Sequence, residues 1–163
     1  MSALKADRAE RFVVGACLAS PSIYWRIAGQ VKARMFGDRW LRQAFGAIEG
    51  LAAEHKEPRV DLVARRMEAD EADDDDPRIM LLALAAAARD DLHLVNDFAQ
   101  EIVDAHVRRR LQAVAKEIGQ KAADLQTEPT TLLAEAEAAV AEIAAAQGGG
   151  RESFGTIVDR VTD

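Results

Sequence analysis

A stripe of apolar residues about thirty positions long dominates the second half of this chain. From about Val95 to Leu125 the apolar residues recur in steps of three, four and five, which is typical of one face of a continuous α-helix. The stripe consists of Val95, Phe98, Ala99, Ile102, Val107, Leu111, Val114, Ala115, Ile118, Ala122 and Leu125. At 1.5 Å per residue such a helix is on the order of 45 Å long, comparable with a small domain. We therefore expect an arm that extends beyond its own globule and offers apolar surface to another molecule.

A second helical stripe follows the break Gln126–Pro129 and ends at Gly148–Gly150. Its members are Leu132, Leu133, Ala136, Val140, Ile143 and Ala144. A short break between two long helices favours an antiparallel helical hairpin. The pattern indicates assembly rather than chemistry.

Composition supports an all-α fold. The chain has 163 residues, of which 49% are hydrophobic and only 5% aromatic, and alanine is abundant in the periodic segments. No stretch reaches the ~18 uncharged apolar residues that a membrane span needs, and the N-terminus has no signal-peptide pattern. We expect a soluble, cytoplasmic protein whose single cysteine, Cys17, is a buried and reduced thiol.

Helix-start signals divide the rest of the chain. We expect a compact multi-helix globule over residues 1–90, the hairpin over 91–147, and a glycine linker with a short linker helix over 148–163. The first helix is predicted at about Asp7–Ala19, and caps of later helices at Ser20-Pro21, Asp38, Asp61 and Asp76-Pro77.

The linker helix carries an apolar stripe of its own. Ser153 can cap it, and its apolar residues fall at i, i+3, i+4 and i+7: Phe154, Ile157, Val158 and Val161. Such a short helix is not stable alone. Either these four residues dock on a partner or a neighbouring subunit, or the segment is a frayed end without function.

No catalytic or metal-binding pattern emerges. The acidic run between Asp70 and Asp76 lacks the spacing and the glycine of an EF-hand, and His55, His93 and His106 lie far apart in sequence. The tract Gly148–Ser153 lacks the lysine and the preceding strand of a phosphate-binding loop. We expect no catalytic residue, no cofactor and no metal.

The net charge argues against strong binding to nucleic acid. The formal net charge is −7, and binding to phosphates is driven by lysine and arginine. Three consecutive arginines, Arg108–Arg110, point around most of a helix, with Lys116 and Lys121 further along. We expect them to pair with acids of the second arm, Glu135, Glu137 and Glu142. Direct single-strand binding at this tract stays open and would require an affinity that falls steeply with salt.

Taken together, the motifs resemble the N-terminal domain of the DnaB family of bacterial replicative helicases. The resemblance spans residues 7 to 163 and rests on several short motifs in the family's order. They are Ala9–Leu18; Phe36 with Arg42, Phe45, Ile48 and Leu51; Glu57–Val63; Phe98-Ala99 with Ile102, Arg109, Leu111 and Glu117-Ile118; and Thr131–Glu137 with Val140 and Ile143. The chain departs from the family at Phe98, at Leu41 and in the acidic stretch 71–76, and it contains no RecA-like ATPase.

The resemblance implies a non-catalytic assembly and partner-docking domain. The hairpin would pair with that of a second subunit, three such dimers would form a hexameric collar, and the collar would receive primase and, in some lineages, a helicase loader. An ATP-dependent helicase would be the parent protein. The alternative is a stand-alone regulatory or phage-type adaptor that binds a host helicase or primase. The expected interface comprises Ile102, Val107, Leu111, Val114, Ile118, Leu132, Leu133, Val140 and Ile143.

Overall fold

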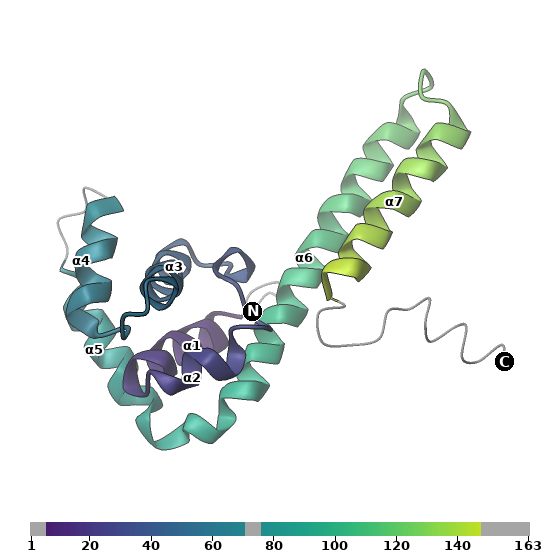
Figure 1. Cartoon of the computed structure of the whole chain (residues 1–163). Coiled ribbons are helices and arrows are strands. Elements are labelled where there is room, and N and C mark those ends of the chain that lie inside the picture. Colours follow the sequence, from purple (N-terminus) through teal and green to yellow (C-terminus); the bar gives the residue numbers. More distant parts are fainter. Residues whose placement is uncertain (1–5, 71–75, 148–163) are drawn as a thin grey trace, which may run out of the picture. The chain divides into compact units, whose positions relative to one another are not determined.

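The computed structural model describes residues 6–70 and 76–147, and every regular element within these ranges is a helix (Figure 1). The all-α prediction is therefore confirmed. In chain order the elements are α1 (Asp7–Ala19), α2 (Ser22–Ile27), the 3₁₀ turn η1 (Ala33–Met35), α3 (Arg39–Ala53), α4 (Val60–Asp70), α5 (Pro77–Ala88), the 3₁₀ turn η2 (Arg89–Leu94), α6 (Val95–Ala123) and α7 (Pro129–Gln147).

The helices fall into two compact units, Met1–His106 and Val107–Asp163. We call the described part of the first the globule and the described part of the second, residues 107–147, the hairpin. The boundary between the units lies inside α6. Val95, Ala99 and Ile102, at the start of α6, are fully buried in the core of the globule.

The globule is organised around the close packing of α1 against α5. Gly15 of α1 makes this possible, since a Cβ atom at this position would lie 2.1 Å from the carbonyl oxygen of Leu84. Phe36 and Phe45 stack in the core with ring centroids 4.8 Å apart. The sequence therefore places a residue without a side chain where two helix backbones approach most closely.

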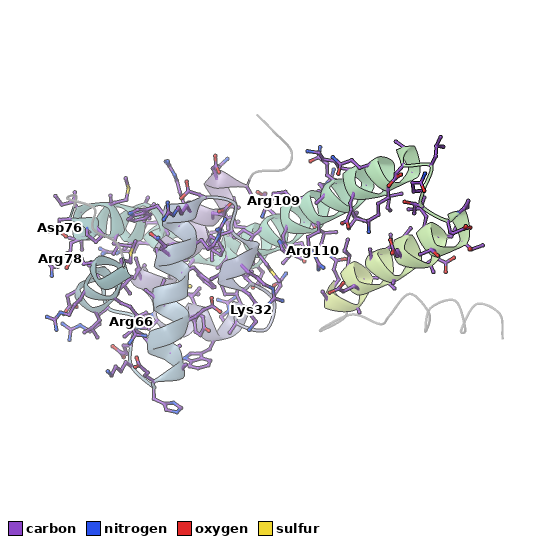
Figure 2. The ribbon with its side chains drawn as sticks, turned by 90° about the horizontal axis from the view of Figure 1, so that it is seen from above. Lys32, Arg66, Asp76, Arg78, Arg109 and Arg110 are labelled. Carbon is purple, nitrogen blue, oxygen red and sulfur yellow. The ribbon has the colours of Figure 1, made fainter. Side chains whose placement is uncertain are left out.

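Two of the predicted helix caps are present in the structure. The Asp38 side chain accepts a hydrogen bond of 2.8 Å from the backbone N–H of Leu41, and Asp76 accepts one of 3.0 Å from the N–H of Arg78. Each satisfies an N–H group that the first turn of a helix leaves without an intrahelical partner. Asp76 and Arg78 also form an ion pair at the start of α5 (Figure 2).

The other two cap predictions were wrong. Ser20 is the residue after the end of α1, and α2 begins after Pro21 without a side-chain cap. Asp61 lies inside the first turn of α4, which starts one residue earlier at Val60, and its carboxylate lies 3.5 Å from Arg59 Nε. An acidic side chain stabilises a helix in the first turn as well as at the cap, so the sequence signal placed the helix start two residues too late, at Leu62 instead of Val60.

Two chemically reactive side chains are buried in α1. Cys17 is fully buried, as expected, and burial raises the pKa of its thiol to about 12, so the thiol stays protonated. Glu10 is also fully buried, and its Oε1 accepts a hydrogen bond of 3.0 Å from the backbone N–H of Asp38. This bond ties α1 to the start of α3.

No helix within the described residues is long and apolar enough to cross a membrane.

Candidate self-association surface

In the hairpin, α6 and α7 are joined at residues 124–128 and run side by side (Figure 1). Along each helix the less exposed residues recur in steps of three and four or multiples of them, which identifies the rows that face the other helix. On α6 this inner row is Val107, Val114, Ile118 and Lys121, and on α7 it is Leu132, Ala136, Ala139 and Ile143. Ile143 is the most buried of them, with 4% of its surface exposed.

One edge of the hairpin is held by an ion-pair cluster. Lys121 Nζ lies 2.9 Å from Glu135 Oε2 on α7 and 3.2 Å from Glu117 Oε1 on its own helix. The hydrogen bonds to Glu135 and Glu117 raise the pKa of Lys121 above its ordinary value. Because the cluster is solvent-exposed, it contributes more to the register of the two arms than to their stability.

A different set of side chains is apolar and open to solvent. Leu111 is 42% exposed, Leu133 64% and Val140 48%, and Leu125 at the end of the hairpin is 96% exposed. Many alanines of the same helices are exposed as well, and three of them directly follow a residue of an inner row: Ala115, Ala122 and Ala144. An exposed group of this kind, on a unit with little core of its own, indicates a surface that binds another molecule.

The register of the helices shows that these residues share one face. Five of them come directly after an inner-row residue: Ala115 after Val114, Ala122 after Lys121, Leu133 after Leu132, Val140 after Ala139 and Ala144 after Ile143. One step along a helix is a rotation of about 100° in a fixed sense. Because the two helices face each other and run in opposite directions, this rotation turns both rows to the same side of the hairpin. We call this side the outer face; it also includes Leu111.

The opposite side of the hairpin is acidic. Glu117, Glu135 and Glu142 each come directly before an inner-row residue, so they are rotated the other way. The ion pairs agree with this assignment, since Lys121 reaches both Glu117 and Glu135. The outer face is therefore the more apolar side of the hairpin, although Arg108 and Glu137 also follow inner-row residues and lie on it.

The residues expected at the interface occupy three different places. Leu111, Leu133 and Val140 lie on the outer face. Val107, Val114, Ile118, Leu132 and Ile143 lie in the inner rows, where they pack the two arms of one hairpin together. Ile102 lies in the core of the globule and is fully buried. The residues proposed for linker-helix docking (Phe154, Ile157, Val158 and Val161) lie outside the described residues.

The interface expected from the sequence did not include the exposed residues Ala115, Ala122, Ala144 or Leu125. The position of the three alanines could in principle have indicated their side of the hairpin, because each follows an inner-row residue by one position. This spacing became informative only once the inner rows were known, since an alanine stripe fits either side of a helix equally well.

The expected pairing between basic residues of α6 and acids of α7 is present at Lys121, which pairs with Glu135. Within the arginine tract, Arg108 is exposed, whereas Arg109 and Arg110 are half-buried on α6 (Figure 2).

Comparison with known proteins identifies the family of the chain. Residues 3–104 match the model of the DnaB-like helicase N-terminal domain. No curated protein matches the chain. The matched segment includes the described globule up to the third turn of α6 and ends before the hairpin. Because the match covers more than half of the sequence, the chain belongs to the DnaB-like helicase N-terminal domain family.

Proposed function

We propose that this chain is an assembly and partner-docking domain of a replicative helicase, and that its hairpin binds the hairpin of a second copy. The observation that carries the proposal is the outer face, where Leu111, Leu133 and Val140 are exposed on one side while Glu117, Glu135 and Glu142 lie on the other. Family membership supports the assembly role. Two copies that cover each other's outer faces would form a four-helix bundle with its apolar rows inside.

The expected affinity is moderate. Fully burying a leucine or valine side chain stabilises by about 1.5–3 kcal/mol, and the three large residues of each face are roughly half-exposed, so two copies gain on the order of 5–9 kcal/mol. The entropy lost on association opposes this gain and is of similar size, so the three large residues of each face do not suffice alone. We expect a dimer in the micromolar range, which needs a net gain of about 8 kcal/mol, and this requires that the exposed alanines of the outer face are covered as well.

A matched pair of alanine substitutions tests the surface. Ala115 lies on the outer face and Ala113 on the opposite side of the same helix, and both are exposed. Ala115→Glu is expected to shift the midpoint of dimerisation to at least ~10-fold higher concentration, because each dimer would bury two carboxylates. Ala113→Glu is expected to leave the midpoint unchanged. Sedimentation equilibrium or light scattering on the full chain from about 1 to 100 μM, a range set by the affinity expected above, measures both.

Leu133→Glu provides the same test on α7. Circular dichroism should show that each variant keeps the helical content of the parent chain, because the substituted positions are exposed. A strict monomer across the whole concentration range for the unmodified chain would refute the proposal. So would equal effects of Ala115→Glu and Ala113→Glu.

We propose further that the assembled domain receives primase or a helicase loader, the partners that the family resemblance implies. Three dimers would form the hexameric collar that presents this surface. Isothermal titration of the full chain with purified primase tests the docking role. Saturable heat with one primase for every two chains would support docking on the dimer. If the heat saturates neither with primase nor, in a parallel titration, with the loader, the docking role is refuted and only the assembly role is left.

A further inference from the structure

Positive charge is concentrated in the part of the globule that runs from α2 to the first turns of α3. The chain as a whole has a formal net charge of −7, yet between Ser22 and Gln43 it carries five cationic residues and one acid, Asp38. The cations are Arg26, Lys32, Arg34, Arg39 and Arg42. We call residues 25–42 the basic segment. At ~0.15 M salt the Debye length is about 8 Å, so a ligand at this segment is affected mainly by the local excess of positive charge.

Four cations of the basic segment are not neutralised by a neighbouring carboxylate. Within residues 6–70 and 76–147, no ion pair with an acid is formed by Arg26, Lys32, Arg34 or Arg42. Lys32 is half-buried, and the three arginines are exposed. Elsewhere in the globule, Arg59, Arg66 and Arg78 each pair with an aspartate or a glutamate. The basic segment therefore keeps a positive charge that no ion pair balances within the described residues.

Backbone carbonyl groups hold two of these cations in place. Lys32, in the loop between α2 and η1, donates a hydrogen bond of 2.6 Å from Nζ to the carbonyl oxygen of Ala28 (Figure 2). Arg42 donates one of 3.1 Å from Nε to the carbonyl oxygen of Phe36. A carbonyl oxygen orients a cation without cancelling its charge, and each cation keeps further N–H donors. Both side chains can therefore present charge and donors to an anionic ligand.

The core of the globule supports the basic segment from below. The rings of Tyr24 and Phe36 pack on the ring of Phe45, with centroids 6.0 Å and 4.8 Å from it. The Glu49 side chain accepts a hydrogen bond of 2.8 Å from the backbone N–H of Ala33. The ends of the segment and its middle are thus fixed to α3, and the nearby acid Glu49 bonds to the backbone instead of to a cation.

Trp25 adds an aromatic ring to the same segment. Its side chain is 64% exposed and contacts Tyr24 at a ring-centroid distance of 5.2 Å and an interplanar angle of 72°. Gly29, four residues later, has no side chain to cover it, and nothing lies within 4 Å of its Cβ position. An open tryptophan ring beside cations is the combination on which proteins stack the bases of single strands.

A single strand of nucleic acid fits both properties of the basic segment. Its phosphates match the cations, and its unpaired bases can stack on the ring, whereas the bases of a duplex are already stacked on each other. An acidic peptide would match the cations alone. We propose that the basic segment binds single-stranded nucleic acid, with phosphates against Lys32, Arg34 and Arg42 and a base stacked on Trp25. The acidic remainder of the chain keeps the affinity modest.

Salt dependence of binding by the full chain tests the phosphate contacts. With a fluorescent oligothymidylate of ~20 nucleotides, anisotropy at ~50 mM salt should give a dissociation constant of roughly 10–100 μM. Three phosphate contacts predict a slope of about −2 in a plot of log K against log salt. No saturable binding at this salt concentration would overturn the proposal.

Two charge-matched variants separate the segment from the net charge. Arg34→Gln should weaken binding about 3- to 10-fold and make the slope shallower by about 0.7. Arg65→Gln removes the same charge at an exposed position of α4 and should change neither quantity beyond the error. Equal effects of the two substitutions would show that the basic segment is not the binding site.

Trp25→Leu tests the stacked base. It is expected to weaken binding at least ~5-fold and to remove the quenching of tryptophan fluorescence by the oligothymidylate. Because Trp25 is exposed, circular dichroism should show an unchanged helical content. A polyglutamate peptide of ~20 residues is the competitor. If it bound as tightly as the oligothymidylate, and Trp25→Leu had no effect, the segment would be a site for acidic peptides and the proposal would be wrong.

This proposal and the proposed dimerisation can fail separately. Arg34 lies in the globule and Ala115 in the hairpin. Arg34→Gln should still dimerise, and Ala115→Glu should still bind the oligothymidylate. Light scattering and anisotropy on both variants therefore show which of the two proposals is contradicted.

Discussion

The globule and the hairpin differ in how much of their apolar surface they cover themselves. In the globule, core residues from α1, α3, α4, α5 and α6 reach complete burial, and aromatic rings stack among them. In the described hairpin, Ile143 is the only residue classed as buried, and several leucine and valine side chains remain open. The difference teaches that the globule can be stable through its own core, whereas the hairpin would gain much of its stability from the second copy that we propose covers its outer face.

The largest expected effect of a single substitution is at the closest helix contact of the globule. Gly15→Ala would place a Cβ atom 2.1 Å from the carbonyl oxygen of Leu84, so α1 and α5 would have to separate. We expect a loss of about 3 kcal/mol or more in the free energy of unfolding, measured by urea denaturation. Gly29→Ala is the control, because nothing lies within 4 Å of its Cβ position. A change below ~1 kcal/mol for Gly15→Ala would show that the two helices can move apart easily.

The second largest effect on stability is expected at the buried carboxylate of Glu10. Glu10→Ala would remove the acceptor for the backbone N–H of Asp38 and leave a cavity in the core. We expect a loss of about 2–3 kcal/mol, again by urea denaturation. The exposed residue Arg11 serves as the comparison, and Arg11→Ala should change stability by less than ~0.5 kcal/mol. Equal effects at the two positions would contradict the structural role of Glu10.

The helix cap of α3 has a smaller effect. Asp38→Ala would leave the N–H of Leu41 without its side-chain acceptor. A loss of about 1 kcal/mol is expected, and Asp38→Asn should recover most of it because the amide oxygen can accept the same bond. Thermal denaturation of the parent chain, Asp38→Ala and Asp38→Asn measures the order of their stabilities. If Asp38→Asn were as unstable as Asp38→Ala, the charge rather than the cap would be responsible.

In the hairpin the glycine substitution should have the opposite sign. A Cβ atom at Gly119 of α6 meets nothing within 4 Å, and the residue lies in the interior of a helix. Gly119→Ala is expected to stabilise α6 by about 0.5–1 kcal/mol, because alanine loses less conformational entropy there. Hydrogen exchange of the amides around residue 119, measured on the monomer at low concentration, should slow about 2- to 5-fold. Faster exchange would mean that the glycine is needed in its present place.

Much of the fold could be predicted from the sequence because local signals and packing agree. α1 spans Asp7–Ala19 as predicted, and α5 begins at the predicted Asp76-Pro77. Both helices carry an apolar stripe, and α5 also has a capped start at Asp76 followed by Pro77. The start of α2 was predicted wrongly because serine is a residue type that often caps helices, whereas here Ser20 is the residue that follows the end of α1.

The exposed and buried positions of the hairpin were harder to predict, for a physical reason. The stripe on α6 is continuous from Val95 onward, and periodicity cannot tell which molecule or which unit covers each part of it. Ile102 is covered by the globule, Val114 is half-buried in the inner row, and Leu111 remains exposed, although all three share one stripe. The covered side of α5 was uncertain for the same reason, because Ile79 and Leu82 are as apolar as Leu81 and Leu84.

Helix α6 is one uninterrupted helix that passes from a fully buried environment to an open one. Its amides near Val95 and Ile102 should exchange with solvent only when the whole globule unfolds, whereas those beyond Val107 should exchange through local opening. Protection of the amides from exchange should therefore decrease along α6 from its buried part to its exposed part. When a partner covers the outer face, the position at which exchange slows should move toward Ala123, so one helix reports the occupancy of the hairpin residue by residue.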